Sequence, residues 1–168
     1  MITAIEAANY FLSKQDSDEP DISNLKLLKL VYYGQAWSLA FRSRPLFAEQ
    51  LEAWQHGPVA PSVYQKFKSN GGQAIAKPET QPELPEADRE LLDMVYAEYA
   101  QYSAWHLRQL THSEPPWKDA HAVFEGAEIS MDSISRFFRE KLNATPPDFE
   151  RLWERSQPID DVIALLAA

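Results

Sequence analysis

The most extended helical pattern of apolar positions begins after Ser23, a residue type that often caps helices. From there to about residue 41, apolar side chains such as Leu27, Leu30 and Val31 recur at α-helical spacing. Tyr32 and Tyr33 broaden the apolar stripe beyond one face. So wide a stripe predicts a long helix that is buried over much of its circumference.

Shorter helical patterns alternate with clear breaks along the rest of the chain. Thr3 and Glu6 form the pattern of a capping box, which predicts a first helix ending before the polar loop of residues 15–20. Pro61 favours the start of a helix to about residue 70, followed by an exposed, proline-containing linker over residues 73–85. Further helices are expected over residues 86–102, 104–112, 117–126, 131–142, 148–156 and 159–168.

Evidence for β structure is confined to one stretch. Residues 46–54 alternate apolar and polar side chains, as in a short strand, although Glu and Gln are weak strand formers. Residues 55–61 contain Gly57, Pro58 and Pro61, and we expect no regular structure there. The predicted fold is mainly α, a single compact multi-helix domain with at most one short β element around residues 46–54. We place the helical domain at residues 1–142 and a C-terminal helical extension at residues 143–168.

The composition is that of an ordinary globular protein, with 168 residues of which 45% are hydrophobic and 24% charged. There is no cysteine, so disulfides, thiol nucleophiles and Cys-based zinc sites are excluded. The N-terminus lacks the basic and apolar regions of a signal peptide. No apolar run approaches the roughly 20 residues that a membrane span needs. We therefore expect a soluble, cytoplasmic protein without a membrane partner.

The charge distribution points to a class of partner. The formal net charge is -9, and residues 85–168 carry eight Lys and Arg against sixteen Asp and Glu, a net of -8. Phosphate backbones would be repelled by this half of the chain, so direct nucleic-acid binding is not expected. A basic protein would instead be attracted, and its encounter with the chain would be accelerated.

No sequence motif points to catalysis. The chain has no phosphate-binding glycine loop, zinc-protease helix or nucleophile elbow. Four candidate metal ligands, namely His112, Glu114, Asp119 and His121, fall within ten residues, but their spacing matches no recognised ligand geometry. We interpret them as surface or supporting groups in a loop, and predict no catalytic residue, metal site or cofactor. A metal-dependent hydrolase using His112, Asp119 and His121 remains an alternative from a different class.

Two segments join tryptophan to rigid turns. One is residues 54–59, in which His56 precedes Gly-Pro, and the other is residues 111–117, in which two prolines precede Trp117. Partly exposed aromatic rings are favoured at protein interfaces. The other interpretation is that Trp37, Trp54, Trp105 and Trp117 are core anchors, and for most of these four it is favoured.

These segments carry a family resemblance. Residues 25–37 (LKLLKLVYYGQAW) resemble the family helix LKLQKLLYYAQGW, and residues 45–64 resemble its PLFxExIEAWxxGPVxPxVY stretch. Residues 111–117 (THSEPPW) resemble the later LTHxExPW signature. Together, in this order, the motifs resemble the Panacea (SocA-like antitoxin) family over about residues 4–140. The matched positions that we single out, as scaffold or as partner-binding residues, are Lys29, Tyr32, Tyr33, Trp37, Trp54, His56, Gly57, Pro58, Tyr64, Thr111, His112, Pro116 and Trp117.

The resemblance implies a function. Panacea domains are antitoxins encoded beside diverse small toxins, which they neutralise largely by direct binding. The expected partner is therefore a cognate protein toxin from a neighbouring gene, and no enzymatic activity is expected. One member of the family hands its toxin to a AAA+ protease, so an adaptor role is an alternative, as is a phage-encoded inhibitor of a host defence protein. Ala167 and Ala168 end an apolar tail similar to those that ATP-dependent proteases recognise, and one hypothesis is that they form a degron. The favoured interpretation of the same tail is an amphipathic last helix that packs on the core.

Overall fold

The computed structural model describes residues 1–144. The predicted segments at 148–156 and 159–168, with Ala167 and Ala168, lie outside the described residues. The helices are α1 (Ala4–Lys14), α2 (Asn24–Arg42), α3 (Pro61–Phe67), the 3-10 helix η1 (Lys68–Asn70), α4 (Glu86–Tyr99), α5 (Ala104–Ser113), α6 (Pro115–Val123) and α7 (Met131–Ala144). The strands are β1 (Glu52–Trp54), β2 (Gly57–Val59) and β3 (Ala127–Glu128). The mainly α class is confirmed.

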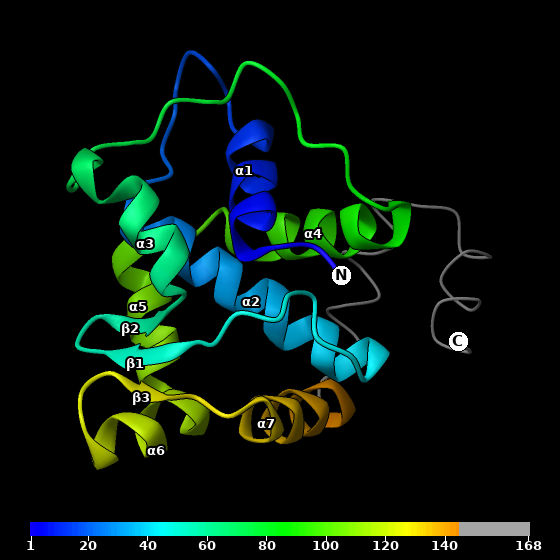
Figure 1. Cartoon of the computed structure of the whole chain (residues 1–168), viewed down its shortest axis with the longest axis vertical. Coiled ribbons are helices and arrows are strands. Elements are labelled where there is room, and N and C mark those ends of the chain that lie inside the picture. Colours follow the sequence, from blue (N-terminus) through cyan, green and yellow to red (C-terminus); the bar gives the residue numbers. More distant parts are fainter. Residues whose placement is uncertain (145–168) are drawn as a thin grey trace.

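Helix α2 passes through the centre of the fold (Figure 1). It contacts α1, α3, α4, α5 and α7, and also strand β2. Every side chain over residues 26–40 is buried, so the predicted burial around most of its circumference is confirmed. Because the helix is buried on all sides, its polar side chains must form their hydrogen bonds with other protein groups.

The helix starts follow the local signals in the sequence. The Thr3 hydroxyl accepts a hydrogen bond from the Glu6 amide at 3.1 Å, and the Glu6 carboxylate accepts one from the Thr3 amide at 2.7 Å, which completes the predicted capping box. Ser23 caps α2 as expected, with its hydroxyl accepting from the Lys26 amide. Helix α6 begins at Pro115 rather than at residue 117, because proline is favoured in the first turn of a helix.

The β structure is more extensive than predicted. Strand β1 falls within the predicted stretch, but it is the centre of a three-stranded antiparallel sheet in the order β2-β1-β3. Strand β2 lies in residues 55–61, for which we had expected no regular structure. Pro58 is tolerated there because β2 is an edge strand, where a missing backbone N–H breaks no ladder. Strand β3 has only two residues, which is too short for an alternating pattern to show in the sequence.

The linker over residues 73–85 is mostly exposed, but it is anchored at two points that were not predicted. The side chains of Ile75 and Leu84 are buried in the core. The Ile75 amide also donates to the Ile22 carbonyl at 2.9 Å, just before α2. The expectation of an exposed linker was therefore wrong at these two residues. No helix in the described part of the chain is long and apolar enough to cross a membrane.

Candidate partner-binding site

A lysine, a glycine and a threonine from three of the motif segments meet in the interior. Lys29 of α2 is fully buried, and its ammonium donates a hydrogen bond to the Pro58 carbonyl at 2.9 Å. Gly57 has a φ of 108°, in a region that L side chains rarely adopt. A Cβ atom there would lie 2.7 Å from Cε of Lys29 and 2.8 Å from Oγ1 of Thr111. The three residues therefore hold the β1–β2 hairpin against α2 and α5.

Burial changes the acid–base properties of Lys29. Loss of water around its ammonium lowers the pKa of Lys29 to about 7, and the positive charge of Arg108 lowers it further in the same direction. No carboxylate in residues 1–144 forms a salt bridge with Lys29. The Lys29 amine thus acts as a structural donor to the hairpin, in a place where carrying a charge is costly.

The aromatic residues of the α2 motif pack inside the core. Tyr32, Tyr33 and Trp37 are all essentially inaccessible to solvent. The Tyr33 ring stacks on Tyr99 of α4 with centroids 3.9 Å apart, and the Trp37 indole donates to the Tyr99 hydroxyl at 3.0 Å. Phe138 of α7 packs edge-on against the Tyr33 and Trp37 rings. These motif side chains therefore join α2 to α4 and α7.

Glu114 is buried in this aromatic cluster, which corrects the expectation that it is a surface loop group. Its carboxylate accepts a hydrogen bond from the Tyr33 hydroxyl at 3.2 Å and lies 3.6 Å from the Lys141 ammonium of α7. Burial raises the pKa of Glu114 to about 7, although the Lys141 charge and the tyrosine hydroxyls act in the opposite direction. The carboxyl therefore connects the α5–α6 junction with α2 and α7.

Two of the histidines sandwich Trp117. The His112 ring stacks on the Trp117 indole at 3.8 Å between centroids, and the His121 ring stacks at 4.6 Å. Burial lowers the pKa of His112 to about 4, with a further contribution from Arg108. The Trp117 indole N–H donates to the Trp54 carbonyl at 3.0 Å, so this stack also supports β1. In residues 1–144, no three His, Asp or Glu side chains are grouped so that they could hold a metal ion.

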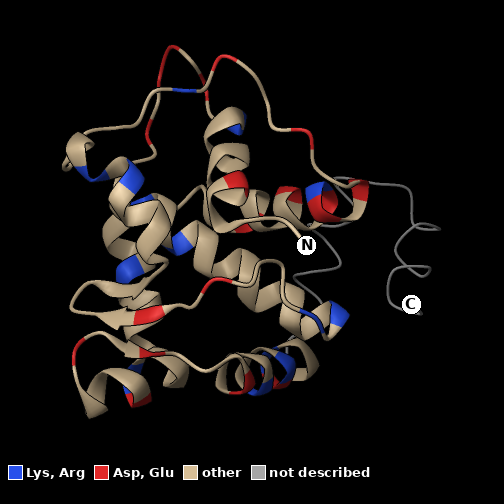
Figure 2. Cartoon of the chain, in the orientation of Figure 1, with Lys and Arg blue, Asp and Glu red and all other residues tan. Residues whose placement is uncertain are grey.

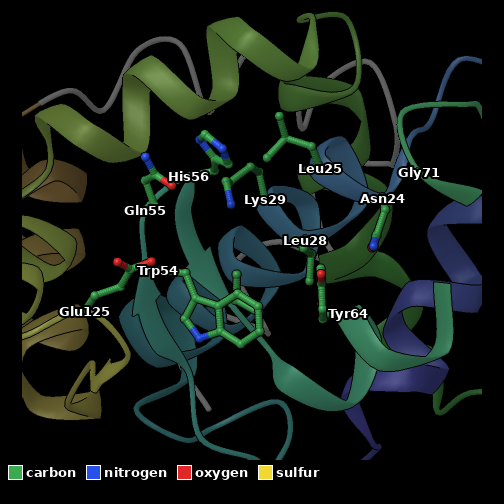
Figure 3. Close-up of a pocket in the computed structure, with 11 residues that line it drawn as sticks. Asn24, Leu25, Leu28, Lys29, Trp54, Gln55, His56, Tyr64, Gly71 and Glu125 are labelled. Carbon is green, nitrogen blue, oxygen red and sulfur yellow. The ribbon is translucent and has the colours of Figure 1, made fainter. Parts of the chain in front are cut away.

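An open cleft lies beside the hairpin, with a volume of about 290 Å³ (Figure 3). Trp54 and Tyr64, whose rings meet edge to face at 4.8 Å, form one wall. The first two turns of α2 supply another wall, through Asn24 and two leucines. The remaining lining residues are Lys29, Gln55, His56, Val59, Gly71 and Glu125. The motif residues Trp54, His56 and Tyr64 are thus brought together at one surface feature.

The outer rim of the cleft contains residues that the sequence analysis missed or misplaced. His56 is exposed, and its Nδ1 accepts a hydrogen bond from Arg108 at 3.2 Å. The Arg108 guanidinium lies over the Trp105 ring, 5.1 Å from its centroid. Trp105 is 61% exposed, so the interpretation of this tryptophan as a core anchor was wrong. Trp37 and Trp117 are buried and Trp54 is half-buried.

The motif residues therefore separate into two groups. Most of them pack against each other: Lys29, Tyr32, Tyr33, Trp37, Gly57, Pro58, Thr111, His112, Pro116 and Trp117. Trp54, His56 and Tyr64 line the cleft, and Lys29 of the packed group lines it as well. Three motif residues have hydrogen-bond partners that the sequence analysis did not indicate: Arg108 for His56, Tyr99 for Trp37 and Glu114 for Tyr33. Each partner lies more than fifty residues away along the chain, so no local pattern connects the two. The fold and the site define a mainly helical scaffold with an open surface cleft.

Comparison with known proteins identifies the family. Residues 27–118 match the family described as "Antitoxin SocA-like, Panacea domain". The chain is 31% identical to "Antitoxin SocA" of Caulobacter vibrioides (strain NA1000 / CB15N), over 94% of each of the two chains. No solved structure matches the chain. The chain belongs to the SocA-like Panacea family of antitoxins, as the sequence motifs predicted.

Proposed function

We propose that this chain is an antitoxin that neutralises a cognate protein toxin by binding it directly. The observation that carries the proposal is its similarity to Antitoxin SocA, at 31% identity over 94% of both chains. Because the similarity runs along nearly the whole chain, it supports a shared role for the protein and not only for one segment. The proposal assigns no chemical step to the chain.

The distribution of the motif residues supports a binding role. The fully buried motif side chains, among them Tyr32, Tyr33 and Trp37, stabilise the scaffold and are not accessible to a partner. The net charge of -9 favours a basic protein partner over nucleic acid. We propose that the partner is encoded by a neighbouring gene, and that binding is stoichiometric.

Co-expression with the neighbouring gene tests this function. The neighbouring reading frame is placed under inducible control, and surviving colonies are counted with and without this chain. We expect the neighbour to be toxic, the chain to restore growth, and the two proteins to co-purify. Restored growth without co-purification, at an unchanged toxin level, would contradict neutralisation by direct binding.

The level of the neighbouring protein separates this function from that of a proteolytic adaptor. An antitoxin that acts by binding leaves its toxin at a constant or raised level, because the complex protects the toxin. An adaptor lowers the toxin level, and this effect disappears in a host that lacks the relevant ATP-dependent protease. Immunoblots of the tagged neighbour in both hosts distinguish the two outcomes.

A further inference from the structure

Two segments with exposed apolar side chains adjoin residues of the cleft. In the described part of the chain, the large hydrophobic residues that remain exposed are Met1, Trp105, Val123 and Phe124. Trp105 contacts His56, which lines the cleft, and Val123 and Phe124 directly precede Glu125, which also lines it. Apolar side chains exposed together at one place are typical of protein-binding surfaces. We call Trp54, His56, Trp105, Phe124 and Glu125 the hairpin-tip face.

The backbone confirms that these elements are neighbours. The Gly126 amide donates to the Ala53 carbonyl at 2.8 Å, which holds the α6–β3 loop beside the hairpin. His56 at the hairpin turn lies against Trp105 of α5, with ring centroids 6.2 Å apart. In Figure 1, the β1–β2 turn and the α6–β3 loop project from the same edge of the molecule. The segments that carry the hairpin-tip face are thus neighbours in the fold.

Asn24, at the start of α2, also lines the cleft. It is 95% buried, and its side-chain oxygen has no hydrogen-bond partner in the described residues. This oxygen is inaccessible to solvent, so the cleft is recognised chiefly through its apolar lining. Leu25, Leu28 and Trp54 supply the apolar lining of the cleft. An apolar side chain of a partner fits this lining.

The charges beside the face indicate a basic partner. Glu52 and Glu128 are directly opposite each other on β1 and β3, an arrangement in which like charges destabilise a sheet. Figure 2 shows these two acidic segments side by side, and Glu125 follows on the adjoining loop. Within residues 1–144, no lysine or arginine forms a salt bridge with any of the three. Two cationic residues lie beside the face: Lys29, whose ammonium bonds to the Pro58 carbonyl, and Arg108, which is engaged by His56 and Trp105.

The same charges argue against two other occupants. A second copy of the chain docked symmetrically on this face would bring Glu52, Glu125 and Glu128 against the same three carboxylates. A nucleic acid would bring phosphates to them, and these would be repelled. Glu52 accepts a hydrogen bond from the Trp54 indole, and Glu128 accepts one from the Gln50 amide, so both carboxylates have neutral donors but no cation. A basic protein segment gains from both the exposed aromatic rings and these uncompensated negative charges.

We propose that the hairpin-tip face is the surface through which this chain holds its toxin. In this arrangement, a basic segment of the toxin lies along β1, β3 and the α6–β3 loop, and one of its aromatic or aliphatic side chains fills the cleft at Trp54. The assignment rests on the proposed antitoxin function and adds to it the site and the chemistry of the partner segment.

Isothermal titration calorimetry tests the assignment. The full chain is titrated with the toxin encoded by the neighbouring gene, which is produced as an inactive variant. W105A/F124A removes two exposed rings, and because both are 61% exposed we expect an unchanged thermal midpoint with Kd weakened at least about 30-fold. E125K/E128K should weaken Kd about 10-fold or more and reduce its salt dependence. The matched control is E79K/E83K, which makes the same charge change in the linker and should stay within about twofold.

The outcomes separate failure of the site from failure of the function. If the wild type binds the toxin and both face variants bind equally well, the toxin is held elsewhere and the hairpin-tip face is overturned alone. If the wild type binds no toxic neighbour, the antitoxin function fails first and takes this assignment with it. If sedimentation shows a dimer that E125K/E128K dissociates, the face belongs to a second copy, which also overturns the proposal. The single variants W105A and F124A replace the double variant if that protein does not fold.

Discussion

Cε of Lys29 lies 2.7 Å from the point where a Cβ atom would stand on Gly57. This approach connects the central helix to the β1–β2 hairpin, and it is possible only because residue 57 has no side chain. The Lys29 ammonium then reaches past Gly57 to the Pro58 carbonyl. Gly57, Pro58 and Lys29 thus form one structural unit. This unit fixes the hairpin that carries Trp54 and His56 to the cleft.

Gly57→Ala should destabilise the protein by roughly 2–4 kcal/mol, because it adds an unfavourable φ and a clash with Lys29 and Thr111. Chemical denaturation in urea measures the loss. Gly126→Ala is the matched control, since its φ is 90° but nothing lies within 4 Å of the added Cβ. We expect about 1 kcal/mol for the control. Equal losses for both variants would contradict the close approach.

Replacing Lys29 with Met should change how stability depends on pH. Below about pH 7 the wild-type lysine is charged in both states, so the cost of burying it is fully present. From about pH 7 to the unfolded value of about 10.4, the unfolded chain holds a proton that the folded chain has lost. The wild type should therefore gain stability over K29M as pH rises, by at most about 1.4 kcal/mol per pH unit. Urea unfolding across this range, with exposed Lys118→Met as control, measures the difference; a flat difference would contradict it.

Glu114→Gln should have the opposite pH signature. The folded pKa of Glu114 is raised from 4.5 to about 7, so in that window the folded chain binds more protons than the unfolded one. The wild type should therefore lose stability relative to E114Q as pH rises from 4.5 to about 7, by at most about 1.4 kcal/mol per pH unit. Thermal or urea unfolding of both proteins measures the loss. Exposed Glu140→Gln should show no such trend.

Trp117→Phe should cost about 1–2 kcal/mol, because it leaves the Trp54 carbonyl without its indole donor. Trp105→Phe is the control, since Trp105 is 61% exposed and its replacement should change stability by no more than about 0.5 kcal/mol. Equilibrium unfolding of both variants gives the comparison. If the two changes cost the same, the Trp117–Trp54 bond does not stabilise the hairpin.

The sequence by itself determined the features that depend on neighbouring residues. The capping box at Thr3, the cap at Ser23 and the burial of α2 all follow from side chains within a few turns of one helix. The order of the motifs, in the same way, identified the family before the fold was known. These signals are local, so they can be interpreted without knowing which distant residues are in contact.

The tertiary structure alone decided where the motif residues act. Glu114 is buried because Tyr33 and Lys141 approach it from α2 and α7, and Trp105 is exposed because its helix turns it toward the hairpin tip. Strands β2 and β3 exist because each pairs with β1, although Gly57 and Pro58 are poor strand formers. Burial and pairing depend on which segments meet in space, and a pattern read along one segment does not contain that information.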